Sequence, residues 1–252
     1  MKIKIRKSKI SNKQYSSAVF PRVTREEASG TAKKEPAKEP LYKLERAPVI
    51  YNEDASLGFF GIKSLKEIIF RMQSEKEKFG ECLNRMITVF SDIVVTDGGV
   101  MDEFSGSGAA FAFSSGSSPV KAIEKTLVTC LRMRYLLNKM NRQWGFHKMP
   151  WNISCGIDYG LVEFREIKEG TETYSALTGK PADTARGIGL SAGNSQILLT
   201  DSTIVKYPAL DTKFDIKPAY HLPVHGQEHL CKIREVVGMV GPQAKKIFED
   251  FA

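Results

Sequence analysis

The sequence has no long apolar run, and this absence excludes a chain that crosses a membrane through helices. No stretch approaches the roughly 18–20 apolar residues that a membrane-spanning helix requires. The N-terminus is basic, but no apolar segment of a secretory signal follows it, so we do not expect export. Only 4 of the 252 residues are cysteines, and no two of them form a Cys-x-x-Cys pair. We therefore expect free thiols in a cytoplasmic protein rather than a disulfide framework or a zinc site.

The body of the chain also lacks a charge excess, although the chain as a whole is basic. The first 50 residues hold 13 Lys or Arg against 5 Asp or Glu, which accounts for the entire net charge of +8. Residues 1–47 are rich in Lys, Ser, Glu, Ala and Pro, a composition typical of segments that do not fold alone. We interpret them as a basic, low-complexity N-terminal extension, followed by a domain over residues 48–240 and a C-terminal helix over residues 241–252.

The extension carries one ordered pattern at its start. Residues 1–7 alternate apolar and basic side chains, which is the period of a β-strand. Such a strand can pair with the sheet edge of a partner or of the protein's own body. Its cations also suit the phosphates of an anionic lipid surface or of a nucleic acid. Because no aromatic residues for base stacking are interleaved, nucleic acid is disfavoured. The extension therefore predicts a tether to a protein partner or to an anionic surface.

The hydrophobic pattern of the body switches repeatedly between the periods of strands and helices. Period-two and apolar segments predict strands over residues 56–62, 100–104, 109–113, 151–157, 161–167 and 196–200, with a late pair near residues 219–224 and 232–237. Helical spacing predicts two consecutive helices over residues 64–94, and further helices over residues 118–144 and 181–193. Ser64 and Glu67 form the Ser-x-x-Glu pattern of a capping box. This order predicts an α+β fold with a ferredoxin-like βαββαβ core, in which helices pack on a mostly antiparallel sheet.

Several segments of the body resemble the class III nucleotidyl (adenylate/guanylate) cyclase homology domain. GGVMDEFSGSGAAFAF at residues 98–113 is similar to the family's G-G-x-x-x-K/E-x-x-G-D-G-x-x-A-x-F hairpin. ISCGIDYG at residues 153–160 resembles I-x-x-G-I-x-x-G, and GKPADTARG at residues 179–187 resembles G-x-x-V-N-x-A-A-R. The resemblance covers roughly residues 56–238. It implies a cyclase-type fold and a dimer whose active sites form between subunits.

The resemblance also implies a metal-dependent reaction, and this chain departs from the family at the metal ligands. In the family, two aspartates hold two metal ions that activate the 3′-oxygen and neutralise the phosphates. The resemblance places Gly61 and Ser107 at these aspartate positions. Neither a glycine nor a serine hydroxyl replaces a carboxylate as a ligand of a hard cation. Asp92 lies in a second Phe-x-Asp-Ile match, but it is too close to Ser107 to leave room for the intervening helices, so we place Asp92 in a helix.

The resemblance further assigns residues that would face a nucleotide. The base-reading position of the family falls on Glu103, whose carboxylate can accept two hydrogen bonds from the edge of guanine. The family's ribose-orienting Asn falls on Asp183, and its phosphate-stabilising Arg falls on Gly187. A one-residue slip in the alignment moves the Arg position to Arg186. The candidate nucleotide-binding residues are Glu103, Lys180, Asp183 and Arg186.

These departures predict a catalytically degenerate cyclase-like domain that acts as a dimerisation or docking module in signalling. We expect no catalytic residues, no metal site, no cofactor and no conventional cyclase activity. The expected partners are another protein or a second copy of the chain. Two alternatives stay open. One is a divergent adenylate or guanylate cyclase that uses substitute ligands such as Asp102, and the other is a sensor that binds a nucleotide without turnover.

Overall fold

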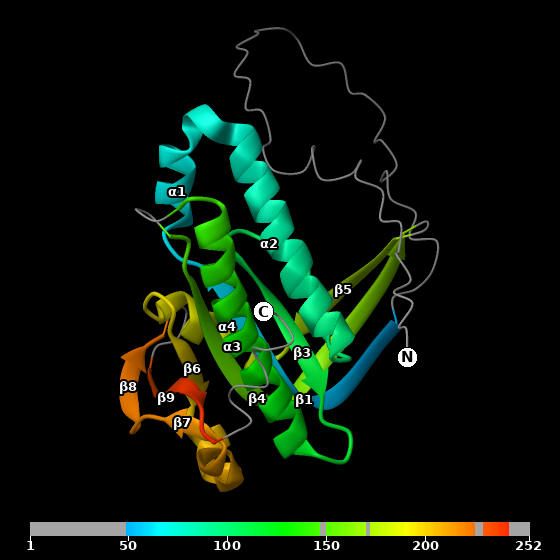
Figure 1. The fold of residues 1–252 in the computed structure, drawn as a ribbon. Coiled ribbons are helices and arrows are strands. Elements are labelled where there is room, and N and C mark those ends of the chain that lie inside the picture. Colours follow the sequence, from blue (N-terminus) through cyan, green and yellow to red (C-terminus); the bar gives the residue numbers. More distant parts are fainter. Residues whose placement is uncertain (1–48, 147–149, 170–171, 225–228, 242–252) are drawn as a thin grey trace, which may run out of the picture. The chain divides into compact units, whose positions relative to one another are not determined.

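The computed structural model describes residues 49–146, 150–169, 172–224 and 229–241, and its helices and strands are labelled in Figure 1. One sheet has the strand order β2-β3-β1-β4-β6-β9-β7, with β5 paired to β4 and β8 paired to β9. All of its pairings are antiparallel except that between β4 and β6. The strands are β1 (Val49–Ile62), β2 (Val100–Met101), β3 (Gly108–Ser114), β4 (Ile153–Glu169), β5 (Glu172–Thr178), β6 (Ile197–Thr200), β7 (Phe214–Ile216), β8 (Tyr220–Pro223) and β9 (Leu230–Met239).

The helices follow the apolar periodicity of the sequence. They are α1 (Leu65–Arg71), α2 (Lys76–Thr96), α3 (Pro119–Gln143), α4 (Lys180–Ser191) and α5 (Asp201–Lys206), with short 3-10 turns at Gln73–Glu75 and Pro208–Thr212. The predicted α+β architecture is therefore confirmed. Asp92 lies on α2, as predicted, and its side chain is exposed. Within the described residues, none of the helices combines the length and the apolarity needed to cross a bilayer.

Both faces of the central sheet are covered by helices. Because side chains alternate along a strand, Phe60 and Phe59 of β1 point to opposite faces. Phe60 belongs to the larger apolar core with α2 and α3, and its ring meets that of Phe90 edge-on at 5.1 Å. Phe59 belongs to a second apolar cluster that includes Ala182 and Ala185 of α4. Figure 1 shows the pair α2 and α3 running across the sheet. These two cores fix the strand β1 that ends at the candidate site.

The predicted strands over residues 151–157 and 161–167 are wrong as separate elements. They form one strand, β4, which pairs with β1 from Ile153 through Glu166. Gly160, which falls between the two predicted strands, lies within β4 opposite Ala55. A Cβ at Gly160 would lie 3.1 Å from Cγ of Pro181, so the glycine admits the first turn of α4. The true hairpin partner, β5, was missed by the sequence analysis, as was β7.

The predicted capping box is also wrong. Ser64 is the N-cap residue of α1, but its side chain makes no capping hydrogen bond and its φ is 55°. The left-handed backbone of Ser64 turns the chain sharply from β1 into α1. Glu67 instead pairs with Arg71 one helical turn later, at 2.5 Å. The four cysteines are free thiols, as expected.

Two predicted segments lie outside the described residues. The N-terminal extension over residues 1–47 is one of them. The C-terminal helix over residues 241–252 is the other, and only its first residue, Gly241, is described. Both remain predictions, together with the domain boundaries drawn from them.

Candidate functional site

The two positions that the resemblance assigns to metal-binding aspartates lie side by side. Gly61 of β1 pairs with Gly108 at the start of β3. The backbone N–H of the next residue, Ile62, donates a hydrogen bond of 2.6 Å to the carbonyl oxygen of Ser107. Gly106 has a φ of +61°, which a glycine adopts readily in the tight turn before β3. The strand register therefore brings Gly61 and Ser107 together without help from any ligand.

A cavity of about 300 Å³ opens at these two residues. It is lined by the end of β1, the start of α1, the hairpin turn, β4 and α4: Gly61, Ile62, Lys63, Ser64, Leu65, Lys66, Ser107, Ser154, Gly189 and Leu190. None of the lining residues is acidic, and two are lysines. Lys63 donates from Nζ to the carbonyl oxygen of Leu190 at 3.1 Å, and burial lowers the pKa of this lysine. Among the described residues, neither Lys63 nor Lys66 is ion-paired with a carboxylate.

This lining does not fit the pair of divalent cations that the resemblance implies. Mg²⁺ and Mn²⁺ prefer carboxylate oxygens, whereas Gly61 has no side chain and Ser107 offers a neutral hydroxyl. A Cβ on Gly61 would lie 3.2 Å from Cε1 of Phe59, so a larger residue requires that ring to move. Nowhere in the described ranges do three or more His, Cys, Asp or Glu residues gather in a metal-binding group. Asp102, the substitute ligand considered above, does not line this cavity.

Asp102 takes part in a second polar cluster, between the hairpin and α4. Nη2 of Arg186 lies 3.9 Å from Oδ2 of Asp102, and the Arg186 guanidinium lies 5.7 Å from the ring centroid of Phe59. Burial raises the pKa of Asp102, although hydrogen bonds from the backbone N–H groups of Glu103 and Leu177 oppose this rise. Sequence reasoning chose Glu103 as the residue that faces a nucleotide base. In the structure Asp102 faces Arg186 and Glu103 is exposed, and the role of Glu103 toward a base stays a prediction.

Of the remaining predicted nucleotide-binding residues, only two lie close together. Asp183 and Arg186 are three residues apart on α4, so they share a side of the helix, and both are exposed. Gly187 is buried, so the orientation of Arg186 toward the hairpin favours the slipped alignment. Lys180 is exposed and its charge acts on Asp158. Over the described ranges, no hydrogen bond or ion pair joins Glu103, Lys180 and Asp183, and their nucleotide role stays a prediction.

Comparison with known proteins identifies the fold. No protein-family model and no curated protein matches the chain. Among solved structures, the adenylyl cyclase CyaB from P. aeruginosa matches with a TM-score of 0.65 at 18% identity, over 78% of this chain and 98% of its own. The chain has the fold of a class III nucleotidyl cyclase domain.

Further cyclase structures agree with this assignment. The guanylyl cyclase Cya2 matches with a TM-score of 0.63 at 18% identity, over 76% of this chain and 95% of its own. The guanylate cyclase domain of RhGC from Catenaria anguillulae, in complex with GTP, matches with a TM-score of 0.61 at 16% identity, over 75% of this chain and all of its own. The guanylyl cyclase domain of the RhoGC fusion protein from Blastocladiella emersonii was crystallised both as a dimer and as a monomer. Similarity at these identities establishes the fold of the domain alone.

Lys63 and Lys66 are the site residues that sequence reasoning missed. Both follow the Phe-Phe-Gly-Ile segment directly, in the sequence Lys-Ser-Leu-Lys, and both line the cavity of this cyclase-fold domain. The signal was present as a pair of lysines at the strand-to-helix turn. It went unused because it lies outside the positions on which the resemblance rests.

Proposed function

We propose that this cyclase-fold domain does not cyclise nucleotides and acts instead as a dimerisation or docking module in signalling, with its basic N-terminal extension as a tether. The single observation that carries the proposal is the lining of the cavity at Gly61 and Ser107, which has two lysines and no carboxylate. Two-metal catalysis requires anionic ligands that hold both cations against each other's repulsion. Here the local charge has the opposite sign, and it disfavours any divalent cation.

The fold is maintained although the metal ligands are missing. The large core packs Phe60, Phe90 and Trp151 with almost no exposure, and the second core buries Leu57 and Val162 equally well. Neither core depends on a ligand at the cavity. A stable domain without its catalytic ligands retains its surface, and a surface can serve association with a second copy or another protein. The RhoGC domain, crystallised both as a dimer and as a monomer, is an example of a domain of this fold that can associate with a second copy.

A turnover assay tests the proposal. Full-length protein is incubated with GTP or ATP in the presence of Mg²⁺ or Mn²⁺, and cyclic nucleotide and pyrophosphate are measured. We expect no product above that of a heat-treated sample. Sedimentation of the same protein over a range of concentrations reports self-association. Product formation would favour the divergent cyclase over the binding module.

A second candidate function is a sensor that binds a nucleotide without turnover. The same cavity favours it, because Lys63 and Lys66 line it together with Ser107 and no carboxylate of the described residues pairs with either lysine. Phosphate oxygens pair readily with such lysines. Glu103, Lys180, Asp183 and Arg186 are the residues proposed to hold the rest of the nucleotide. Calorimetry with GTP and with ATP, each in excess EDTA, tests this candidate, and an absence of heat in both titrations eliminates it.

A further inference from the structure

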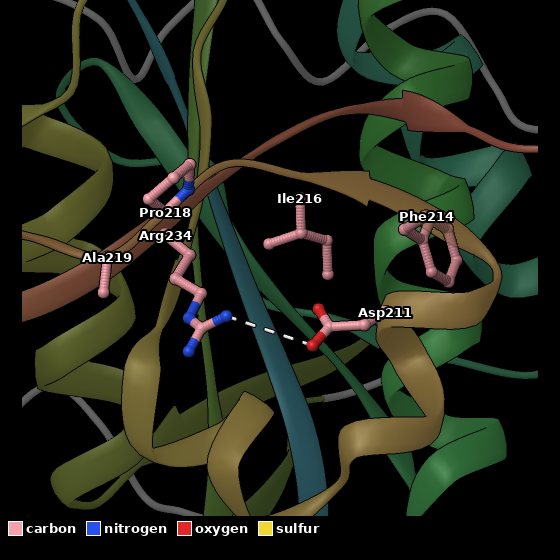
Figure 2. A pocket seen from close by; sticks show the side chains of 6 residues that line it. All are labelled: Asp211, Phe214, Ile216, Pro218, Ala219 and Arg234. Atoms are coloured by element: carbon pink, nitrogen blue, oxygen red, sulfur yellow. Dashed lines mark ion pairs between the residues drawn. The ribbon is translucent and has the colours of Figure 1, made fainter.

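A second cavity of about 450 Å³ lies along β9, and its lining residues are drawn in Figure 2: Asp211, Phe214, Ile216, Pro218, Ala219 and Arg234. It forms where β9 changes partner. β8 pairs with β9 as far as Ile233, and β7 pairs with it from Val236 onward, with a register shift after Asp215. The link between β7 and β8 passes this gap and is held by a hydrogen bond of 2.9 Å from the Lys217 N–H to the Glu235 carbonyl. The cavity is therefore built by ordered backbone.

Arg234 is held in place by the buried carboxylate of Asp201. Its Nε donates to Oδ1 of Asp201 at 2.6 Å, and the other carboxylate oxygen of Asp201 lies 2.9 Å from Nζ of Lys232. The Asp201 side chain is 7% exposed, so the negative charge that orients Arg234 is buried and compensated by two cations. With Nε used in this way, the planar guanidinium keeps both Nη groups as free donors, and Figure 2 shows one of them directed across the cavity at Asp211. Nothing in the described part of the chain accepts a hydrogen bond from these Nη groups.

Asp211 faces Arg234 across the cavity without reaching it. Oδ2 of Asp211 lies 3.9 Å from Nη1 of Arg234, which is beyond hydrogen-bond distance. The Asp211 side chain is 47% exposed, so this pair stabilises the fold little and a ligand displaces it at small cost. One positive and one negative group thus share a cavity, and the described residues leave hydrogen-bonding capacity on each of them unused.

The charges and the walls select one class of ligand. A simple anion at Arg234 would meet the Asp211 carboxylate, and a simple cation at Asp211 would meet Arg234. A ligand with an ammonium beside a carboxylate satisfies both groups with charge-assisted hydrogen bonds. Ile216, Pro218 and Ala219 add an apolar wall, and the volume lies within the range of small-molecule sites. We propose that this cavity binds a free α-amino acid with an apolar side chain, its carboxylate on Arg234 and its ammonium on Asp211. The proposal is independent of the function proposed above, because none of these residues lines the cavity at Gly61.

Leucine and two truncated analogues test the proposal on the full-length protein. Isothermal titration with L-leucine is compared with 4-methylpentanoate, which lacks the ammonium, and with 3-methylbutylamine, which lacks the carboxylate. We expect leucine to bind, and each analogue to bind at least about tenfold more weakly, because each leaves one charged partner unsatisfied. Leucine that gives no binding signal up to about 10 mM, or analogues that bind as well as leucine, would overturn the proposal.

Two variants assign the binding to the cavity. Asp211→Asn and Arg234→Gln should each weaken leucine binding at least about tenfold. Asp215→Asn is the matched control, since Asp215 is an exposed residue of β7 outside the lining, and it should bind like the native protein. Arg234→Gln also disturbs Asp201, so thermal unfolding is measured alongside. Asp211 is exposed and its replacement leaves the fold intact, so equal leucine binding by the Asp211→Asn and Asp215→Asn proteins would by itself refute the assignment.

Discussion

The carbonyl oxygen of Ser107 accepts a hydrogen bond of 2.6 Å from the backbone N–H of Ile62. This bond fastens the hairpin turn to the end of β1. The start of β3 approaches the end of β1 so closely that a Cβ at Gly108 would lie only 2.1 Å from the carbonyl oxygen of Phe60. Backbone contacts alone therefore hold Gly61 beside Ser107. The two positions that the resemblance assigns to metal-binding aspartates are therefore held together by the backbone, whichever side chains they carry.

Gly156 of β4 tests the packing of α4 against the sheet. A Cβ at Gly156 would lie 2.1 Å from the carbonyl oxygen of Ala185 and 2.4 Å from the backbone nitrogen of Gly189. Because both obstacles are backbone atoms, Gly156→Ala should lower the free energy of unfolding by about 3 kcal/mol in urea denaturation.

Gly80 supplies the matched control for this glycine replacement. It lies inside α2, where nothing stands within 4 Å of an added Cβ. Gly80→Ala should raise the free energy of unfolding by about 0.5–1 kcal/mol, because alanine favours the helix. A Gly156→Ala protein as stable as the Gly80→Ala protein would contradict the close packing of α4.

Hydrophobic period and motif order predicted the fold class, the helices and most strands of the sheet. Two strands were not predicted, and the longer of them, β5, comes after a strand that continues through Gly160 instead of ending there. A single sequence does not show whether a glycine ends a strand or admits a neighbour, and here the neighbour is Pro181 on a later helix. The short β7 has only three residues, too few for a period to be read.

The candidate site was predicted less completely than the fold. Alignment with the family hairpin and the first strand placed Gly61 and Ser107, and the structure brings them together. The orientation of Asp102 was not predictable, because it depends on the N–H of Leu177 in the strand that was missed. The cavity on β9 was also beyond sequence reasoning, since Asp211 and Arg234 meet only through the change of partner along that strand.

Lys63 and Lys66 should determine how tightly the cavity at Gly61 and Ser107 binds anions. Because no carboxylate in the described ranges pairs with either lysine, we expect tripolyphosphate to bind in excess EDTA. The double replacement Lys63→Gln and Lys66→Gln should weaken this binding at least about tenfold in isothermal titration, and added salt should weaken it in the native protein. Lys121→Gln, an exposed position on α3, should bind like the native protein. Tripolyphosphate binding that requires a metal ion and is unchanged by the double replacement would contradict the anion site.

Asp201 should contribute to stability in a pH-dependent way. Hydrogen bonds from Lys232 and Arg234 lower the pKa of Asp201 in the folded protein. Its contribution is therefore fully present above the unfolded-state pKa of about 3.9 and is lost as the pH falls through the lower folded pKa. Asp201→Asn should reduce the free energy of unfolding by about 2 kcal/mol at pH 7, because it leaves Lys232 and Arg234 without their partner.

The pH profile distinguishes this effect from simple loss of packing. Urea denaturation between pH 2 and pH 7 should show a constant difference between the native protein and the Asp201→Asn protein down to about pH 4, and convergence below it, where the Asp201 carboxylate takes up a proton in the folded protein. Asp92→Asn, at an exposed position on α2, serves as the control and should follow the native profile throughout. A constant difference between native and Asp201→Asn proteins across this range would contradict the assigned ion pairs.

Binding of Mn²⁺ tests the central claim most directly. Full-length native protein and the double replacement Gly61→Asp and Ser107→Asp are titrated with Mn²⁺, and the free ion is followed by electron paramagnetic resonance. Ser105→Asp, on the exposed side of the same turn, controls for added charge. The native and Ser105→Asp proteins should leave Mn²⁺ free, whereas the double replacement should bind it at least about tenfold more tightly, because it supplies two carboxylates at one point. Native protein that binds Mn²⁺ as tightly as the double replacement would contradict the account.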